Sequence, residues 1–248
     1  MPQIFQRGAN LVPLKILLVL GAFATGAMGA VWYYFTPKYT KIGYQPSQPI
    51  PFSHKLHAGQ IGIDCRFCHS FAETAAHSNL PSSQVCMSCH SQVQKDNPKL
   101  EPLRQAWASG KGVPWVQIHK TPDYVYFNHS VHLNRGVSCV TCHGRVDQMD
   151  VVYQAKSLTM EFCLDCHRNP ETQLRPLDKV AQLGWTAPTD PLELAALVGK
   201  QLGSKTGELN LKPGDKVSPA NAQKIMGEHF RDLRGVHPPD SNCAGCHR

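Results

Sequence analysis

The longest hydrophobic pattern in the chain is an uncharged run of 20 residues near the N-terminus. It extends from Ile16 to Phe35 and has the sequence ILLVLGAFATGAMGAVWYYF. At 1.5 Å rise per residue, a helix of this length spans about 30 Å, the thickness of the hydrocarbon core of a bilayer. The aromatic residues from Trp32 to Phe35 end the run as an interfacial belt does. The pattern predicts one transmembrane helix within residues 1–36.

This run also has features of a signal peptide, because Ala27 to Ala30 offer the small residues that a cleavage site needs. The apolar stretch is longer than a signal core, which favours a retained anchor. The flanking charges are balanced: Arg7 and Lys15 precede the run, and Lys38 and Lys41 follow it. The distribution of lysine and arginine therefore does not orient the helix.

Beyond the anchor, capping signals predict two short helices, both in the C-terminal segment. The first begins at Asp190, which can cap it. Pro191 lies in its first turn, Glu193 completes a capping box, and the helix ends at Gly203. The second begins at Ser218, again followed by proline, and runs towards His229. The whole chain has 19 prolines and 19 glycines, and we expect mostly coil in the remainder.

An internal repeat organises the middle of the chain. The segment FSHKLHAGQIGIDCRFCH, residues 52–69, aligns with FNHSVHLNRGVSCVTCH, residues 127–143, with one gap. In each copy a second CxxCH motif follows the first, 21 or 24 residues further on. We therefore expect a stalk over residues 37–51, a core of two tandem units over 52–170, and a C-terminal segment over 171–248.

The ten cysteines form five CxxC pairs with none left over, and a histidine follows every pair. CxxCH is the attachment motif of c-type haem, in which two thioethers hold the porphyrin and the histidine binds the iron. Zinc ribbons need no histidine after each pair, and five pairs cannot be divided into Cys₄ sites. A disulfide framework is disfavoured because two residues between paired cysteines is a spacing typical of redox or ligand sites rather than of structural disulfides. The predicted thioether residues are Cys65, Cys68, Cys86, Cys89, Cys139, Cys142, Cys163, Cys166, Cys243 and Cys246, and the predicted proximal iron ligands are His69, His90, His143, His167 and His247.

Five covalently bound haems also explain the composition, because aromatic residues make up only 8 % of the chain and the porphyrins would fill the interior. The predicted fold class is a multihaem cytochrome c, mostly coil with short α-helices around stacked haems, plus one N-terminal transmembrane helix. The formal charge of +7 omits ten haem propionates, which would bring the loaded protein to about −3. The basic pI is therefore no argument for nucleic-acid binding, and we expect none.

Histidines outside the motifs are candidates for the second axial position of each iron. There are eight of them, so all five irons can be saturated, which favours electron transfer over catalysis at an open site. The pairs His54/His57 and His129/His132 are three residues apart, so on a helical turn they leave the same side of the backbone. The expected distal ligands are His54, His57, His119, His129 and His132, with His77 and Met160 as further candidates and His229 and His237 as weaker ones. Met160 is equally well explained as a core residue packed on a porphyrin.

The segment from Pro122 to Glu171, PDYVYFNHSVHLNRGVSCVTCHGRVDQMDVVYQAKSLTMEFCLDCHRNPE, resembles the pentahaem cytochrome c subunit of alternative complex III. The likeness extends over nearly the whole chain: one N-terminal span, paired FxHxxH segments, four clustered motifs and a terminal fifth. More distantly, the chain is similar to class III multihaem cytochromes of the c3/c7 type.

The resemblance implies an electron-relay subunit, not an enzyme by itself, in a membrane complex that oxidises quinol. Its implied partners are an iron–sulfur, molybdopterin-like subunit, polytopic quinol-binding subunits and a monohaem cytochrome c, with a cytochrome c or a terminal oxidase as electron acceptor. Because c-type haem is attached outside the cytoplasm, the expected location is the cytoplasmic membrane with the haem domain on the periplasmic side. Two alternatives remain: an anchored cytochrome that oxidises quinol by itself, and a catalytic multihaem reductase.

Overall fold

The computed structural model describes residues 7–35, 41–202, 215–237 and 242–247. The chain divides into two compact units, residues 1–42 and 43–248. Each unit is described separately below.

The first unit is a single apolar helix. A 3₁₀ turn, η1 (Arg7–Leu11), leads into α1 (Val12–Phe35), which contains the whole predicted span. The continuous helix from Gly8 to Phe35 has 28 residues, none of them buried, and its length and composition suffice to cross a membrane. A signal sequence passes the same test.

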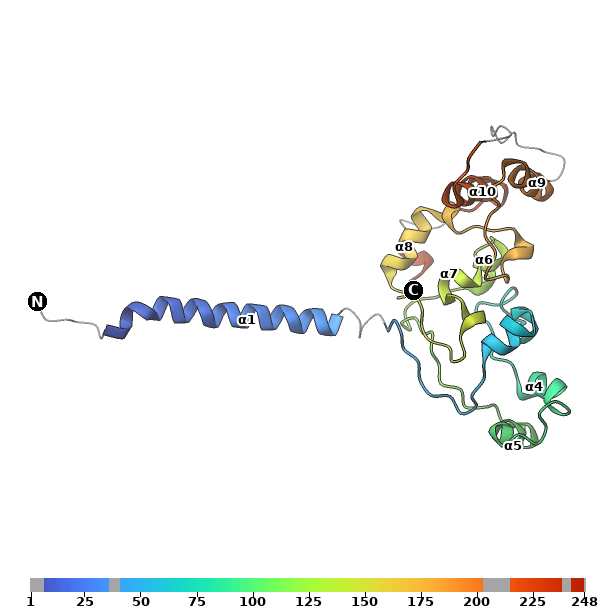
Figure 1. Ribbon diagram of the computed structural model, residues 1–248, viewed down its shortest axis with the longest axis horizontal. Helices are drawn as coiled ribbons and strands as arrows, with labels where there is room; N and C mark the ends of the chain where they lie inside the picture. The colour runs from blue at the N-terminus through green and yellow to red at the C-terminus, as the bar shows by residue number, and fades with distance from the viewer. Residues whose placement is uncertain (1–6, 36–40, 203–214, 238–241, 248) are drawn as a thin grey trace, which may run out of the picture. The chain divides into compact units, whose positions relative to one another are not determined.

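The second unit is built from short helices joined by irregular backbone (Figure 1). Within the described residues, β-structure is limited to two isolated bridges, Val125 with His247 and Val137 with Leu174. The prediction of short helices in a largely irregular chain is confirmed. The α-helices are α3 (Cys65–Cys68), α4 (Ser83–His90), α5 (Glu101–Ser109), α6 (His129–Asn134), α7 (Cys139–His143), α8 (Met160–Arg168), α9 (Pro191–Leu202) and α10 (Pro219–Leu233). The 3₁₀ and π turns are η2 (Lys55–Gln60), η3 (Pro98–Leu100), η4 (Val146–Gln148), η5 (Pro170–Thr172), η6 (Leu177–Lys179) and η7 (Cys243–Gly245).

Residues 43–51, which belong to the predicted stalk, run along this second unit. The backbone N–H of Gly43 donates to the carbonyl of Gln154 at 2.8 Å, and the N–H of Gln154 donates to the carbonyl of Tyr44 at 3.0 Å. Ile50 is buried. This stretch is therefore held by the folded unit, and residues 36–40 lie outside the described residues.

The two helices predicted in the C-terminal segment are present as α9 and α10. The Asp190 carboxylate accepts hydrogen bonds from the N–H groups of Leu192 and Glu193, both at 2.9 Å, and the Ser218 hydroxyl caps α10 through the N–H of Asn221. The predicted end of the first helix at Gly203 lies outside the described residues. The second helix continues past His229 to Leu233.

Helices α9 and α10 lie side by side at one end of the unit, and α4 and α5 lie at the other end (Figure 1). The α9/α10 end has an ordinary side-chain core, formed by Leu174, Ala187, Leu194, Val198, Ala222, Met226 and Phe230. In residues 52–170, only five hydrophobic residues are buried: Ala72, Leu103, Ala106, Leu133 and Met149. The polypeptide alone therefore supplies a core for the C-terminal helices but very little for the region that carries four of the five CxxCH motifs.

Candidate haem-binding site

Four of the five CxxCH motifs lie on short helices, α3, α4, α7 and α8, and the fifth lies on the 3₁₀ turn η7. Residues three apart on one turn point to the same side of a helix, so both cysteines of a motif face one ligand. Two of these helices, α3 and α8, start at side-chain caps: the Asp64 carboxylate accepts from the N–H of Arg66 at 2.8 Å, and the Thr159 hydroxyl accepts from the N–H of Phe162 at 3.4 Å.

The two FxHxxH segments have the same local geometry. The Phe52 ring lies 4.8 Å from the His54 ring and 4.4 Å from the His57 ring, and the Phe127 ring lies 4.8 Å and 4.4 Å from the rings of His129 and His132. Each phenylalanine therefore fixes the orientation of both imidazoles of its segment. The sequence repeat pointed to these phenylalanines, but their role as ring supports is visible only in the structure.

Three of the outer histidines face the motif histidines across a nearly constant gap. Ring centroids are 6.2 Å apart for His57 and His90, 6.2 Å for His132 and His167, and 6.5 Å for His129 and His143. Metal–imidazole bonds of about 2.0 Å on both sides of one iron place the two centroids roughly 6 Å apart. The separations fit an iron held between two imidazoles.

In five of the candidate histidines, a hydrogen bond to one ring nitrogen leaves the other nitrogen free for a metal. The Nδ1 atom lies within 2.9 Å of a backbone carbonyl oxygen in five histidines, namely His57 (Ser53), His69 (Asn79), His90 (Val93), His129 (Ala76) and His132 (Asn128). A carbonyl only accepts, so Nδ1 carries the proton and Nε2 keeps its lone pair. These carbonyl partners could not be identified from the sequence, because each depends on the local backbone path.

Burial keeps two further histidines neutral. The pKa of His143 is lowered to about 3, first by burial and then by neighbouring histidine charges, and the pKa of His54 is lowered to about 4 for the same reasons. The neutral imidazole is the form that binds iron. The charges that act on His54 come from His69 and His57, so His54 lies close to the first motif.

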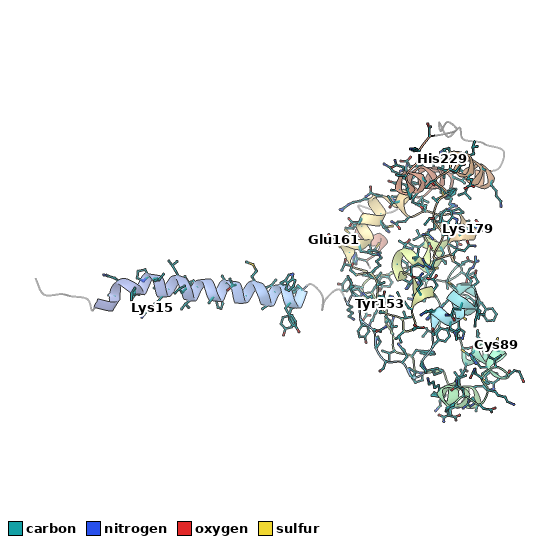
Figure 2. The ribbon with its side chains drawn as sticks, viewed as in Figure 1. Lys15, Cys89, Tyr153, Glu161, Lys179 and His229 are labelled. Carbon is teal, nitrogen blue, oxygen red and sulfur yellow. The ribbon has the colours of Figure 1, made fainter. Side chains whose placement is uncertain are left out.

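The remaining candidates occupy different positions. His119 has a buried Nε2 without a hydrogen-bond partner, and its ring touches that of His143 edge-on at 4.4 Å. His77 is exposed, and Met160 is the first residue of α8 with 60 % of its surface exposed. His237 is exposed, and His229 lies on α10, at the opposite end of the unit from Cys89 (Figure 2).

The fifth motif returns to the segment just before the second FxHxxH copy. The N–H of Tyr126 donates to the carbonyl of Cys246 at 2.8 Å, and His247 forms a bridge with Val125. The Tyr124 ring stacks on His247 with centroids 5.7 Å apart. The chain terminus is therefore brought next to the motifs of the core, although it is far from them in sequence.

A hollow of about 510 Å³ lies beside Cys166 of the fourth motif. Its wall includes the Phe162 ring and the cationic side chains of Lys156 and Arg175. An aromatic ring suits the flat face of a porphyrin, and the cations suit its propionates. The residues present thus fit haem both at the axial positions and around its rim.

Facing imidazoles beside CxxCH helices, in a region that lacks a side-chain core, place this chain among the multihaem c-type cytochromes, which bind haem c covalently. A model of the family described as cytochrome c7 and related cytochrome c matches residues 125–185. A relative in Nitratidesulfovibrio vulgaris (strain Hildenborough), the "Menaquinone reductase, multiheme cytochrome c subunit", is 32 % identical over 146 residues, which is 50 % of this chain and 70 % of the relative. The chain belongs to the family of multihaem cytochrome c subunits that this relative represents.

Proposed function

We propose that this chain holds five c-type haems and relays electrons between proteins. The observation that carries the proposal is the repeated 6.2–6.5 Å gap between outer and motif histidines. Bound haem iron supplies one-electron redox chemistry. With both axial positions taken by side chains, no position is open for a substrate, which favours a relay over a catalytic reductase.

The protein residues in this proposal bind and orient the cofactor. The ten motif cysteines form the thioethers, and the five motif histidines are the proximal ligands. His57, His129 and His132 are the distal ligands at the second, third and fourth motifs, because each faces that motif's histidine. His54 serves the first motif, since it occupies in the first FxHxxH copy the place of His129 in the second. His119, with its free buried Nε2, remains a distal candidate, as do His77 and Met160.

We further propose that α1 is a retained anchor in the cytoplasmic membrane and that the haem-binding unit lies on the periplasmic side. The support is the length of the apolar helix and the attachment of c-type haem outside the cytoplasm. A full-length chain in purified membranes, resistant to extraction by alkaline carbonate, is the expected result. Recovery of a soluble chain that has lost α1 would favour a signal peptide.

The complex that we propose for this subunit is a quinol-oxidising one of the alternative complex III type. In it, polytopic subunits oxidise quinol, an iron–sulfur subunit passes electrons to this chain, and a monohaem cytochrome c or a terminal oxidase accepts them. The support is the tandem FxHxxH layout with a terminal fifth motif. A second direction of flow is favoured by the name of the relative, a menaquinone reductase subunit, in whose complex electrons pass to the quinone.

Haem content and ligation test the relay itself. A pyridine haemochrome assay on the full chain should give five haems per polypeptide, and the Cys243→Ser/Cys246→Ser variant should give four. Near-infrared magnetic circular dichroism should show low-spin irons throughout, with mostly bis-histidine ligation. Fewer than five haems in the unmodified chain, or zinc in their place, would refute the proposal.

The direction of flow is tested on the intact complex isolated from membranes. Adding a reduced quinol analogue should reduce the haems if the complex oxidises quinol. If the complex reduces quinone instead, haems reduced beforehand by a protein donor should be reoxidised by added quinone. Haem reduction by the quinol analogue in the isolated subunit would indicate a self-sufficient quinol dehydrogenase.

A further inference from the structure

The first and second motifs share the first pair of outer histidines. His57 faces His90 of the second motif at 6.2 Å, and His54 lies three residues before it in the same FxHxxH segment. The carbonyl of His57 accepts a hydrogen bond from the N–H of Ile63, two residues before Cys65 of the first motif, at 3.0 Å. The first and second motifs are therefore direct neighbours.

The first and third motifs meet over a single short stretch of backbone. The Cys65 thiol donates to the carbonyl of Ala181 at 3.9 Å, and the N–H of Cys139 donates to the carbonyl of Val180 at 3.3 Å. These contacts join the two halves of the sequence repeat through their first motifs, not through their second ones.

The third and fourth motifs share the second pair of outer histidines. His129 and His132 lie on one turn of α6, and they face His143 and His167 respectively. This arrangement repeats the relation between the first and second motifs.

The fifth motif is adjacent to the fourth. Its Cys246 is hydrogen-bonded to Tyr126, and Phe127, the next residue, packs on His132, which faces the fourth motif. The chain thus places its last motif beside the preceding one, although Cys243 lies 77 residues after Cys166.

Exposure distinguishes the two ends of this arrangement. Of the ten cysteines, only Cys89 and Cys243 are exposed, and the other eight are half-buried. Cys89 belongs to the second motif, at the α4/α5 end of the unit (Figure 2), and Cys243 belongs to the fifth. The first, third and fourth motifs, which each have two neighbours, are the ones with no exposed cysteine.

We propose that the five haem sites form one unbranched series in the order second, first, third, fourth, fifth, and that electrons are exchanged with partner proteins at its two exposed ends. The proposal deepens the relay function and rests on it. One electron enters from a reduced donor protein and one leaves to an oxidised acceptor protein, with no bond made or broken in this chain. The order differs from that of the motifs in the sequence, in which the second would lie between the first and the third.

The order is tested by counting the neighbours of a single altered site in the full holoprotein. Changing a distal histidine to methionine keeps the iron six-coordinate and raises its reduction potential. The altered charge distribution then shifts the potentials of the sites next to it. In redox titrations followed by electron paramagnetic resonance, His57→Met should move two of the five components, its own and the first site's. His129→Met, at the middle of the series, should move three.

The His57→Met and His129→Met variants are matched, because each removes one imidazole from an equivalent FxHxxH segment. Equal numbers of shifted components, or more for His57→Met, would overturn the order. A count below five haems in the unmodified chain would instead refute the relay function, so the two failures are distinguishable.

A measurement on the unmodified protein covers the case in which a variant does not load its haems. A soluble gadolinium chelate should broaden the haem methyl resonances of two sites, the second and the fifth, far more than those of the other three. Equal broadening of all five sets, or strong broadening of only one, would overturn the assignment of the exposed ends.

Discussion

Phe230 on α10 is the largest wholly buried side chain of the unit that carries the haem sites, and its removal tests how the C-terminal helices are held. It packs in the core formed with Leu174, Leu194 and Met226, all fully buried. Truncation of a buried phenylalanine to alanine costs about 3–5 kcal/mol. Phe230→Ala should therefore make local opening of α9 and α10 about 150- to 4,000-fold more frequent.

Hydrogen–deuterium exchange of the holoprotein measures this directly. Amides in residues 191–202 and 219–233 should lose protection by that factor, while those of α3, α4 and α7 keep theirs, because haem and not this core holds the motifs. Leu233→Ala is the matched control: it lies on the same helix but is 45 % exposed, so its cost should stay below about half that of Phe230→Ala. A loss of protection for Phe230→Ala smaller than tenfold, or one shared equally by α3 and α4, would refute the reasoning.

Three other predictions follow from single contacts. Gly227→Ala should destabilise α10 by about 1–3 kcal/mol in chemical denaturation, because the added methyl group meets the carbonyl of Glu171, whereas Gly112→Ala, with open space around it, should change stability little. Hydrogen bonds and charge from the guanidinium two residues on hold the pKa of Asp64 below its usual 3.8, so this carboxylate stabilises the fold above about pH 4 and the contribution is lost as pH falls through the folded value. Asp64→Asn should accordingly lower the Tm at pH 7, and the difference from the unmodified protein should diminish as the pH falls through the folded pKa of Asp64. Deletion of residues 1–42, behind a cleavable export signal, should release a soluble periplasmic chain with its haem content unchanged, and a membrane-bound product would contradict the role of α1 as the anchor.

Local patterns in the sequence predicted the elements whose causes are local. The apolar run predicted α1, and the caps at Asp190 and Ser218 predicted where α9 and α10 begin, because a cap satisfies backbone groups only a few residues away. The repeat predicted two equivalent FxHxxH segments, and the ring distances in the two copies agree to the tenth of an ångström.

Helices α3, α4, α7 and α8 were not predicted one by one, because they have four to nine residues each and no apolar face of sufficient length to show a period. Their stability comes from what they pack on, which the sequence names only through the CxxCH motif. The Nδ1 acceptors of the histidines were likewise hidden, since they are backbone carbonyls that any residue could provide.

The amino-acid sequence by itself determined the chemistry of this protein: the CxxCH motifs name the cofactor, the spare histidines supply candidates for the second ligands, and the apolar run supplies a candidate anchor. Only the tertiary structure decided which histidine faces which motif, that the terminal motif lies beside the fourth, and which motifs reach the surface. The physical reason is that ligand type is a property of single residues, whereas pairing depends on contacts between segments far apart in the sequence, such as Tyr126 with Cys246, which are 120 residues apart.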